Sequence, residues 1–193
     1  MIAYIKKNKP AKPMPAAFLD RDGTIIHDRA GSYLTCAAKM RLYKAAPEAL
    51  KIIQDLGYRL IIITNQSAVS RGYMTLAKSI AINRKLAEIL RRKGVLIEGI
   101  YFCPHAPGQN CRCRKPRPGL VKEALKRHKI DLKKSVMIGD KESDAMLAKN
   151  LGIKFIMLMT GQGKSQRKCN SRNFLTSRNL KEAARKLAVQ TLP

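Results

Sequence analysis

The chain has 193 residues, 45% of them hydrophobic, which is enough for a single globular domain with a sizeable core. No stretch reaches the roughly 20 consecutive apolar residues of a membrane span, and prolines interrupt the basic N-terminus before a signal-peptide core could form. Lys and Arg number 39 against 13 Asp and Glu, so the formal net charge of +26 predicts attraction to anions. Five cysteines without an export signal favour a reducing compartment, and we expect the cytoplasm.

Strand-like and helix-like patterns alternate along the chain. Residues 1–13 are expected to form a basic N-terminal tail, and residues 14–193 a single domain. Apolar runs predict strands near residues 15–19, 59–64, 98–102, 135–139 and 154–159. Helical spacing predicts helices near residues 47–56, 75–93, 119–128, 142–151 and 179–188, and a loop is expected over 161–178. The alternation predicts an α/β fold with a parallel sheet and helices on both faces.

Two carboxylates follow the first predicted strand. Asp20 and Asp22 stand one residue apart directly after the apolar residues 16–19, and Gly23 comes next. Ligands of open α/β sheets bind beyond the carboxyl ends of the strands. Glycine permits the tight turn that a loop around an anion or a metal requires. The pattern is typical of a phosphoryl-transfer site; the alternative is an acidic cap at the start of a helix.

Two further predicted strands also end in polar side chains. The run of residues 61–63 ends at Thr64, and the strand near residues 135–139 ends at Asp140. Together with the DRDGT string that begins at Asp20, these strand ends resemble the first, second and fourth motifs of the haloacid dehalogenase (HAD) superfamily of phosphohydrolases, in the same order. The resemblance implies an HAD-like, Rossmann-type fold of three layers around a parallel sheet. The chain leaves no room for a large cap domain.

A second signal is a cluster of metal-ligand residue types. Three thiols and one imidazole lie within eleven residues, at Cys103, His105, Cys111 and Cys113. Zinc prefers four sulfur or nitrogen ligands in a tetrahedron, and a site with all four places taken by protein is structural. The alternative is a chance cluster of free surface cysteines. The remaining cysteines, Cys36 and Cys169, have no partners at ligand spacing and are expected to be apolar fillers or exposed thiols.

Four motifs narrow the resemblance. The DRDGT start, the TNQS segment at residues 64–67, the CPH…CxCRKP loop over residues 103–116 and the GDK string at residues 139–141 are similar to those of the D-glycero-D-manno-heptose 1,7-bisphosphate phosphatases and the related histidinol-phosphate phosphatases. The resemblance covers roughly residues 14–190. It implies a monomeric, Mg²⁺-dependent enzyme that removes a phosphate from a sugar bisphosphate through an aspartyl-phosphate intermediate.

The resemblance also implies roles for individual residues. Asp20 is expected to be the nucleophile, and Asp22 to protonate the leaving alkoxide and then to activate water. Asp20, the backbone carbonyl of Asp22, and Asp140 are expected to hold Mg²⁺. Phosphate or substrate binding is expected of Thr64, Asn65, Arg114, Lys115, Lys141, Asp28 and Arg29, although the loop that carries the last two is longer here than the family's pattern.

These residue types suit the chemistry. Phosphoryl transfer depends mostly on positioning and on stabilising the charge of the phosphoryl oxygens. Two carboxylates can approach a phosphate dianion only if cations offset the repulsion, a task for Mg²⁺, Lys115 and Lys141. Asp144 lies one helical turn beyond Asp140 and either orients the site or is an ordinary first-turn carboxylate.

Three functions stay open. The leading one is hydrolysis of heptose bisphosphate, and the second is another substrate on the same scaffold, either histidinol phosphate or a 3′-phosphorylated nucleic acid end. The third is a non-enzymatic, basic, zinc-containing nucleic-acid-binding protein. Nucleic acid is not favoured, because the basic residues are dispersed and only 5% of residues are aromatic, with no Trp for base stacking.

Overall fold

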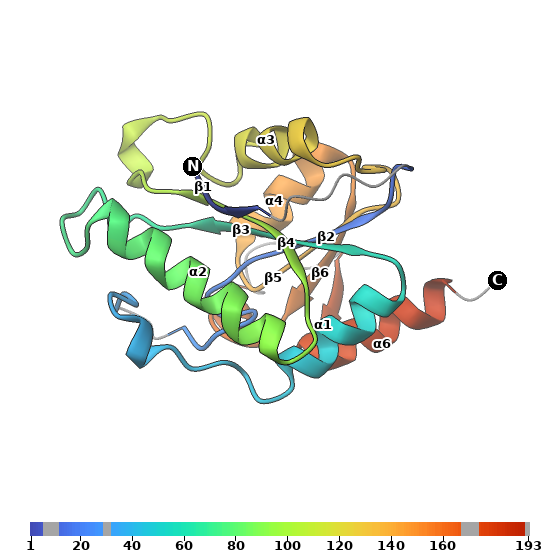
Figure 1. Ribbon diagram of the computed structural model, residues 1–193. Coiled ribbons are helices and arrows are strands. Elements are labelled where there is room, and N and C mark those ends of the chain that lie inside the picture. Colours follow the sequence, from blue (N-terminus) through green and yellow to red (C-terminus); the bar gives the residue numbers. More distant parts are fainter. Residues whose placement is uncertain (6–11, 29–31, 167–173, 192–193) are drawn as a thin grey trace.

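The computed structural model describes residues 1–5, 12–28, 32–166 and 174–191, and its centre is a seven-stranded sheet (Figure 1). The strands are β1 (Ile2–Ile5), β2 (Ala16–Leu19), β3 (Arg59–Asn65), β4 (Ile97–Cys103), β5 (Val136–Gly139), β6 (Lys154–Leu158) and β7 (Leu175–Ser177). Their order across the sheet is β1-β4-β3-β2-β5-β6-β7. All neighbouring pairs run parallel except β1, which is antiparallel to β4. Apart from this edge strand, the sheet is the parallel one that the alternating pattern predicts.

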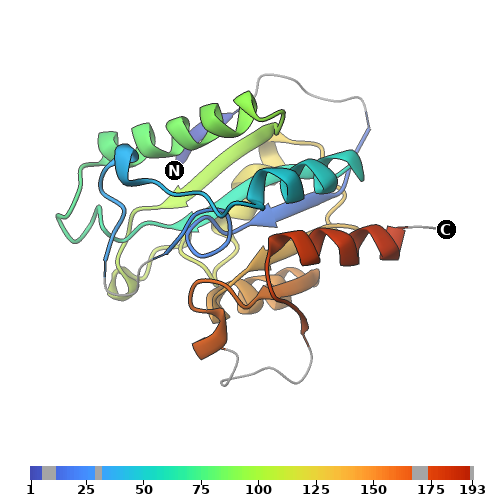
Figure 2. The same cartoon turned by 90° about the horizontal axis from the view of Figure 1, so that it is seen from below.

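Helices cover both faces of this sheet and complete three layers (Figures 1 and 2). The helices are α1 (Ala46–Asp55), α2 (Leu76–Arg92), α3 (Gly119–Arg127), α4 (Glu142–Leu151), α5 (Gly163–Gln166) and α6 (Leu180–Thr191), with short 3-10 turns at Ala37–Lys39 and Pro107–Gln109. Buried side chains of α1, α2 and α6 share one hydrophobic cluster, and those of α3 and α4 share another. None of the helices in the described part of the chain combines the length and apolar character of a membrane span.

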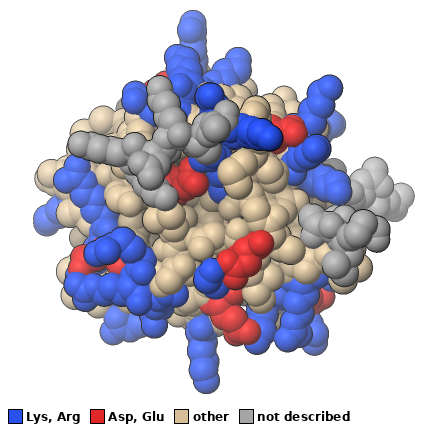
Figure 3. All heavy atoms as spheres, turned by 45° about the vertical axis from the view of Figure 1, so that its right-hand side comes forward, with Lys and Arg blue, Asp and Glu red and all other residues tan. Residues whose placement is uncertain are grey.

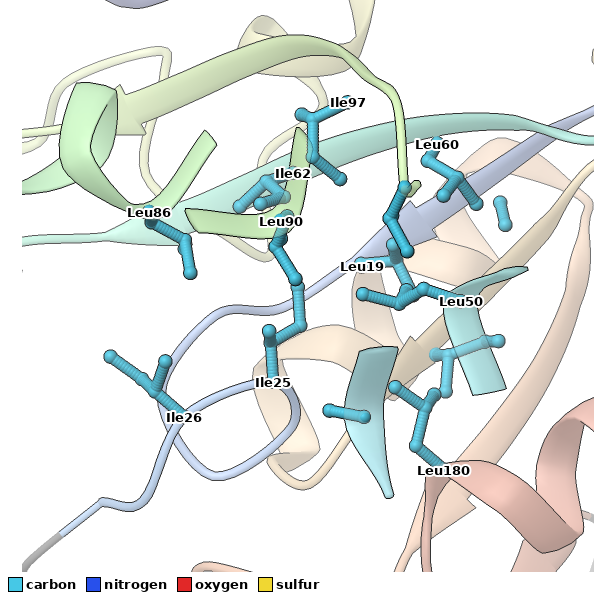
Figure 4. Packing of buried hydrophobic residues seen from close by; sticks show 14 of the residues in the cluster. Leu19, Ile25, Ile26, Leu50, Leu60, Ile62, Leu86, Leu90, Ile97 and Leu180 are labelled. Atoms are coloured by element: carbon cyan, nitrogen blue, oxygen red, sulfur yellow. The ribbon is translucent and has the colours of Figure 1, made fainter. Parts of the chain in front are cut away.

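The strands supply both clusters in alternation. In β2, Leu19 packs with α1, α2 and α6, whereas the neighbouring Phe18 packs with α3 and α4. In β3, Ile62 packs with α1, α2 and α6, and Ile61 packs with α3 and α4. Successive side chains of a strand point to opposite faces, so a parallel strand that is covered on both sides must be apolar throughout. Figure 4 shows Leu19 and Ile62 packed among side chains of the surrounding helices.

The structure corrects two expectations about irregular segments. Within the segment expected to be a basic tail, Ile2–Ile5 forms an edge strand, and the terminal ammonium group donates to the carbonyl of Phe102 at 2.9 Å. Within the expected loop over residues 161–178, the chain forms the short helix α5 and the edge strand β7. Both strands are short and take their partners from strands formed elsewhere in the chain. The prediction of a single domain over residues 14–193 stays a prediction.

The strand order sets the position of the polar strand ends. β2 lies between β3 and β5, and all three run parallel. The residues that follow or end them, Asp20, Thr64 and Asp140, therefore meet at one edge of the sheet. This is the edge at which an open α/β sheet binds its ligands.

Candidate active site

Asp20 is buried between two ammonium groups. It follows β2 with 2% of its surface exposed. Lys115 Nζ lies 2.8 Å from its Oδ1, and Lys141 Nζ lies 3.3 Å from its Oδ2. Burial opposes ionisation of this carboxyl, but Lys115 and Lys141 outweigh it and hold the pKa of Asp20 below its usual range. Asp20 is therefore an ionised carboxylate, the form that a nucleophile needs.

Lys115 is held by three acceptors. Its Nζ contacts Asp20, the carbonyl of Ile63 at 2.8 Å and Asp144 Oδ1 at 2.6 Å. Burial lowers the pKa of Lys115, but the two carboxylates raise it more, so the pKa stands above its ordinary value and the ammonium form is retained. Asp144 also accepts the backbone N–H of Lys141 at 3.1 Å, in the first turn of α4. Asp144 is thus both a helix-capping carboxylate and the residue that orients Lys115.

Three oxygen atoms, one of them from Asp20, converge on Lys141 Nζ. Lys141 Nζ lies 3.3 Å from Asp20 Oδ2, 2.8 Å from the carbonyl of Asp22 and 3.4 Å from Asp140 Oδ1. These are the three oxygens that the sequence suggests for Mg²⁺. Burial raises the pKa of Asp140 to about 7, and Asp20 adds to this effect while Lys141 opposes it. Carboxylate oxygens of Asp20 and Asp140 lie within 4.8 Å of each other, and hard oxygen donors of this kind fit Mg²⁺, because a divalent cation offsets their repulsion.

The loop after β6 closes the site from the other side. Gln162 donates its backbone N–H to Asp140 Oδ2 at 2.8 Å and its side-chain amide to Asp28 Oδ2 at 3.0 Å. Thr160 Oγ1 donates to the carbonyl of Gly23 at 2.6 Å. Sequence reasoning missed these residues; the one signal was the sequence Thr-Gly-Gln-Gly directly after a strand.

Asp22 has different neighbours from Asp20. Its carboxylate accepts from Gln66 Nε2 at 2.7 Å and from Arg21 Nε and Nη2 at 3.1 and 3.0 Å. Gln66 Nε2 also lies 2.9 Å from Thr64 Oγ1. Arg21 and Gln66 are therefore part of the site, although their residue types alone did not indicate it.

Most of the predicted residues line one pocket of about 510 Å³, although Asp140 is not among them. Its walls include nearly all the predicted catalytic and substrate-binding residues, namely Asp20, Asp22, Asp28, Thr64, Asn65, Arg114, Lys115 and Lys141. The amide of Asn65 also bonds both backbone groups of Lys115, at 3.0 and 3.2 Å, so it fixes that part of the wall. Arg71 and Tyr73 line the same pocket and were not predicted. Arg29 lies outside the described residues.

The four predicted zinc ligands face one another at the end of β4. The three sulfur atoms lie 3.2–3.5 Å apart, and His105 Nδ1 lies 3.5 Å from Cys103 Sγ and 3.3 Å from Cys113 Sγ. A tetrahedron with Zn–S bonds of about 2.3 Å has edges of roughly 3.8 Å, so the donor set matches zinc in type and number, with distances a few tenths of an ångström shorter than these edges. Arg114 Nη1 donates to the carbonyl of His105 at 3.0 Å. The cluster therefore adjoins Arg114 and Lys115 directly. Cys36 is exposed, and Cys169 lies outside the described residues.

Comparisons with known proteins identify relatives of this chain. The model of the HAD-hydrolase-like family matches residues 112–183. The D-glycero-beta-D-manno-heptose-1,7-bisphosphate 7-phosphatase of Helicobacter pylori is 46% identical over 146 residues, which are 75% of this chain and 83% of that protein. The probable D-glycero-D-manno-heptose-1,7-bisphosphate 7-phosphatase of Thermoplasma acidophilum is 39% identical over 80% of this chain and 94% of its own length.

A solved structure extends the likeness to the fold. The D,D-heptose 1,7-bisphosphate phosphatase of B. bronchiseptica, in complex with magnesium and phosphate, superposes with a TM-score of 0.84 at 26% identity. The match covers 92% of this chain and 99% of that one.

Proposed function

Because this chain belongs to the HAD family of D-glycero-D-manno-heptose-1,7-bisphosphate 7-phosphatases, we propose that it hydrolyses the 7-phosphate ester of heptose 1,7-bisphosphate. The observation that carries the proposal is the position of Asp20 between the ammonium groups of Lys115 and Lys141, with Asp22 in the same pocket. The relatives are phosphatases, and this chain has both Asp20 and Asp22, so a non-enzymatic nucleic-acid-binding protein is no longer a competing hypothesis.

The reaction proceeds in two displacements. An oxygen of Asp20 attacks phosphorus, the bond from phosphorus to the ester oxygen breaks, and Asp22 gives a proton to the leaving alkoxide. Asp22 then takes a proton from water, which attacks phosphorus, releases inorganic phosphate and regenerates the Asp20 carboxylate. Two easier steps thereby replace one difficult displacement.

Cations keep the anionic partners together. Lys115 and Lys141 contact Asp20, and Thr64 lies in the same pocket wall, so all three are placed to bind the oxygens of the transferring group. Asp20, the Asp22 carbonyl and Asp140 would hold Mg²⁺, which supplies further charge compensation to the phosphoryl oxygens. The mechanism therefore depends on residues from four separate segments of the chain.

The pocket favours a substrate with a second anionic group. Arg71 and Arg114 line it in addition to Lys115 and Lys141. The pocket therefore has more cationic side chains than a single phosphate group needs. A bisphosphate uses both parts of the pocket, whereas histidinol phosphate offers a single phosphate and a cationic amine. The basic side chains outside the pocket are spread over the visible face rather than gathered in a stripe (Figure 3), which disfavours a nucleic acid end.

A substrate panel tests the proposal. Phosphate release is measured from heptose 1,7-bisphosphate, histidinol phosphate and a 3′-phosphorylated oligonucleotide, each with and without Mg²⁺. We expect the highest kcat/KM for the bisphosphate, and release that requires the metal. Higher kcat/KM for either competitor would overturn the substrate assignment.

Substitution of the two carboxylates tests the assigned roles. Asp20→Asn and Asp22→Asn should each lower kcat by at least about 100-fold while the folded structure remains, because one removes the nucleophile and the other the proton donor. Circular dichroism provides the control for folding. Turnover near that of the unmodified enzyme in either variant would contradict its role.

The Cys103, His105, Cys111 and Cys113 cluster is proposed as a structural zinc site. Elemental analysis of the purified protein should give one zinc per chain.

Thiolate ligands of this kind suit a reducing compartment, so the cytoplasm is the proposed location. A monomer is proposed as well, and light scattering measures it.

A further inference from the structure

Arg21 stands between the two proposed catalytic carboxylates in sequence, yet its side chain lies away from solvent. It is 1% exposed. Its guanidinium donates to Asp22, to Gln66 Oε1 at 2.8 Å and to Asn83 Oδ1 at 2.8 Å. Burial of a cation is costly unless its partners are fixed and well aligned. Arg21 meets this condition with partners from three separate elements.

Arg21, Asp22 and Gln66 form a closed ring of hydrogen bonds. Arg21 Nε and Nη2 donate to the two oxygens of Asp22, and Arg21 Nη2 also donates to Gln66 Oε1. Gln66 Nε2 completes the ring by donating to Asp22 Oδ2. A two-pronged contact between guanidinium and carboxylate fixes the plane of the carboxylate as well as its position. The ring thus leaves the Asp22 carboxylate little rotational freedom.

Asn83 anchors the ring to helix α2. It is fully buried, and its Nδ2 donates to the carbonyl of Ser79 one turn earlier at 3.0 Å. This bond orients the amide so that Oδ1 faces Arg21. Asn83 is absent from the residues that line the pocket, so it reaches the site only through Arg21.

We propose that Arg21, anchored by Asn83, is a positioning residue that aims the Asp22 carboxyl group at the oxygen of the leaving group. The inference rests on the proposed acid–base role of Asp22. Proton transfer depends on hydrogen-bond geometry between the acid and the oxygen that receives the proton. Gln66 also contacts Thr64, which ties the ring to the residue placed at the transferring phosphoryl group. The ring therefore fixes Asp22 relative to the transferring phosphoryl group and to the oxygen that leaves it.

The test compares two leaving groups. An alkyl phosphate such as the sugar substrate needs a proton on its departing oxygen, whereas p-nitrophenolate leaves without one. Rapid-quench measurement of the first displacement in Arg21→Lys and Asn83→Ala should show a loss of about 10-fold to 100-fold with the sugar phosphate. The loss with p-nitrophenyl phosphate should stay below about threefold, because general acid catalysis contributes little there. Arg21→Lys keeps the charge and removes the two-pronged contact.

Controls separate positioning from stability. Ile82→Ala removes a buried side chain from the same helix and leaves the hydrogen-bond partners of Arg21 in place, so it should lower the melting temperature and leave the ratio of the two rates unchanged. Equal losses with both substrates in Arg21→Lys and Asn83→Ala would overturn the inference and show a purely structural ring.

The acid–base role of Asp22 and the positioning role of Arg21 can be refuted separately. If Asp22→Asn shows no selective loss with the sugar phosphate, the proposed acid–base role is wrong. If Asp22→Asn shows the selective loss and the Arg21 and Asn83 variants do not, the role stands and only the positioning inference falls.

Discussion

Gly23 shows how closely the loop after β2 approaches Asp140, a proposed Mg²⁺ ligand. Its φ of +87° lies in the left-handed region, and a Cβ at this position would lie 2.1 Å from Asp140 Oδ2. Under about 3 Å, a real Cβ contact requires a neighbour to move, and here the neighbour is a fully buried carboxylate. The loop can therefore pass over Asp140 only where the residue has no side chain.

Gly23→Ala should displace Asp140 and so weaken Mg²⁺ binding and lower kcat by at least about 10-fold, since small misplacements of reacting groups are costly. Isothermal titration with Mg²⁺ and steady-state kinetics measure the two effects. Gly57→Ala is the matched control, because φ is +86° there and nothing lies within 4 Å of the added Cβ. It should lower stability by about 1 kcal/mol and leave Mg²⁺ binding unchanged. Equal Mg²⁺ affinity in both variants would contradict the steric argument.

His128 links stability to pH at the opposite end of the sheet. It is buried, its Nε2 lies 2.9 Å from Tyr101 Oη, and its Nδ1 lies 3.7 Å from Glu98. Burial lowers the pKa of His128 below the ordinary 6.5, helped by Arg59 and Arg127 and opposed by Glu98. Below pH 6.5 the unfolded chain therefore binds a proton that the folded protein resists, and this group's contribution to stability is lost as pH falls.

Urea unfolding at pH 8 and pH 5.5 measures that loss. His128→Gln stays neutral in both states, so its free energy of unfolding should fall less with acidification than that of the unmodified protein. The difference in slope is at most about 1.4 kcal/mol per pH unit, the limit for one proton. Parallel curves for the two proteins would show that His128 does not titrate differently on folding.

At the scale of elements, the loop of residues 103–113 couples a proposed metal site to the catalytic pocket. Its four donor side chains face one another, and Arg114 and Lys115 follow directly in the chain. Zinc binding to a structural site contributes on the order of 10 kcal/mol in small modules, and less in a domain with its own core. The metal would thus mainly stabilise the loop that carries the two cations.

Cys111→Ser should lose zinc and lower the melting temperature by several degrees, and it should reduce kcat/KM through displacement of Lys115. Elemental analysis, thermal melts and kinetics measure these three effects. Cys36→Ser is the control, because Cys36 is exposed and lies outside the cluster. Zinc retained at one per chain in Cys111→Ser would contradict the ligand set.

Most helices and strands of this fold could be predicted from the sequence. Strands β2 to β6 and the five longer helices lie within one residue of their expected bounds, except that α6 ends three residues later than expected. Continuous apolar runs and helical spacing are local signals. Strands β1 and β7 have three or four residues each, and they exist through pairing with β4 and β6. No local pattern encodes such a partner, so periodicity could not predict them.

Some residues of the site could be predicted from the sequence, and others could not. Asp20, Thr64 and Asp140 could be predicted because the strand order brings the ends of neighbouring parallel strands together. Asn83 could not, because it lies in the middle of an amphipathic helix and acquires its role only when α2 packs beside Arg21. Contacts between side chains of packed elements are a property of the folded structure alone.

At the scale of the whole molecule, the excess of basic side chains affects stability. The formal net charge is +26, and Figure 3 shows Lys and Arg distributed over the visible face with few Asp and Glu between them. Like charges on a compact surface repel one another, and unfolding separates them. The exposed ion pairs that oppose this repulsion, such as Lys51 with Asp55, contribute little individually.

Added salt should therefore stabilise this protein. The Debye length falls from about 30 Å at 0.01 M to about 10 Å at 0.1 M, so NaCl screens the repulsion between distant basic groups before it weakens contacts within the pocket. We expect the melting temperature to rise by a few degrees between about 0.01 and 0.3 M NaCl, with most of the rise at the low end. Sodium chloride is preferred to sulfate or phosphate, because those anions resemble the substrate and would also stabilise by binding the pocket. A melting temperature that falls with NaCl would mean that attractive pairs outweigh the repulsion despite the threefold excess of basic residues, 39 against 13.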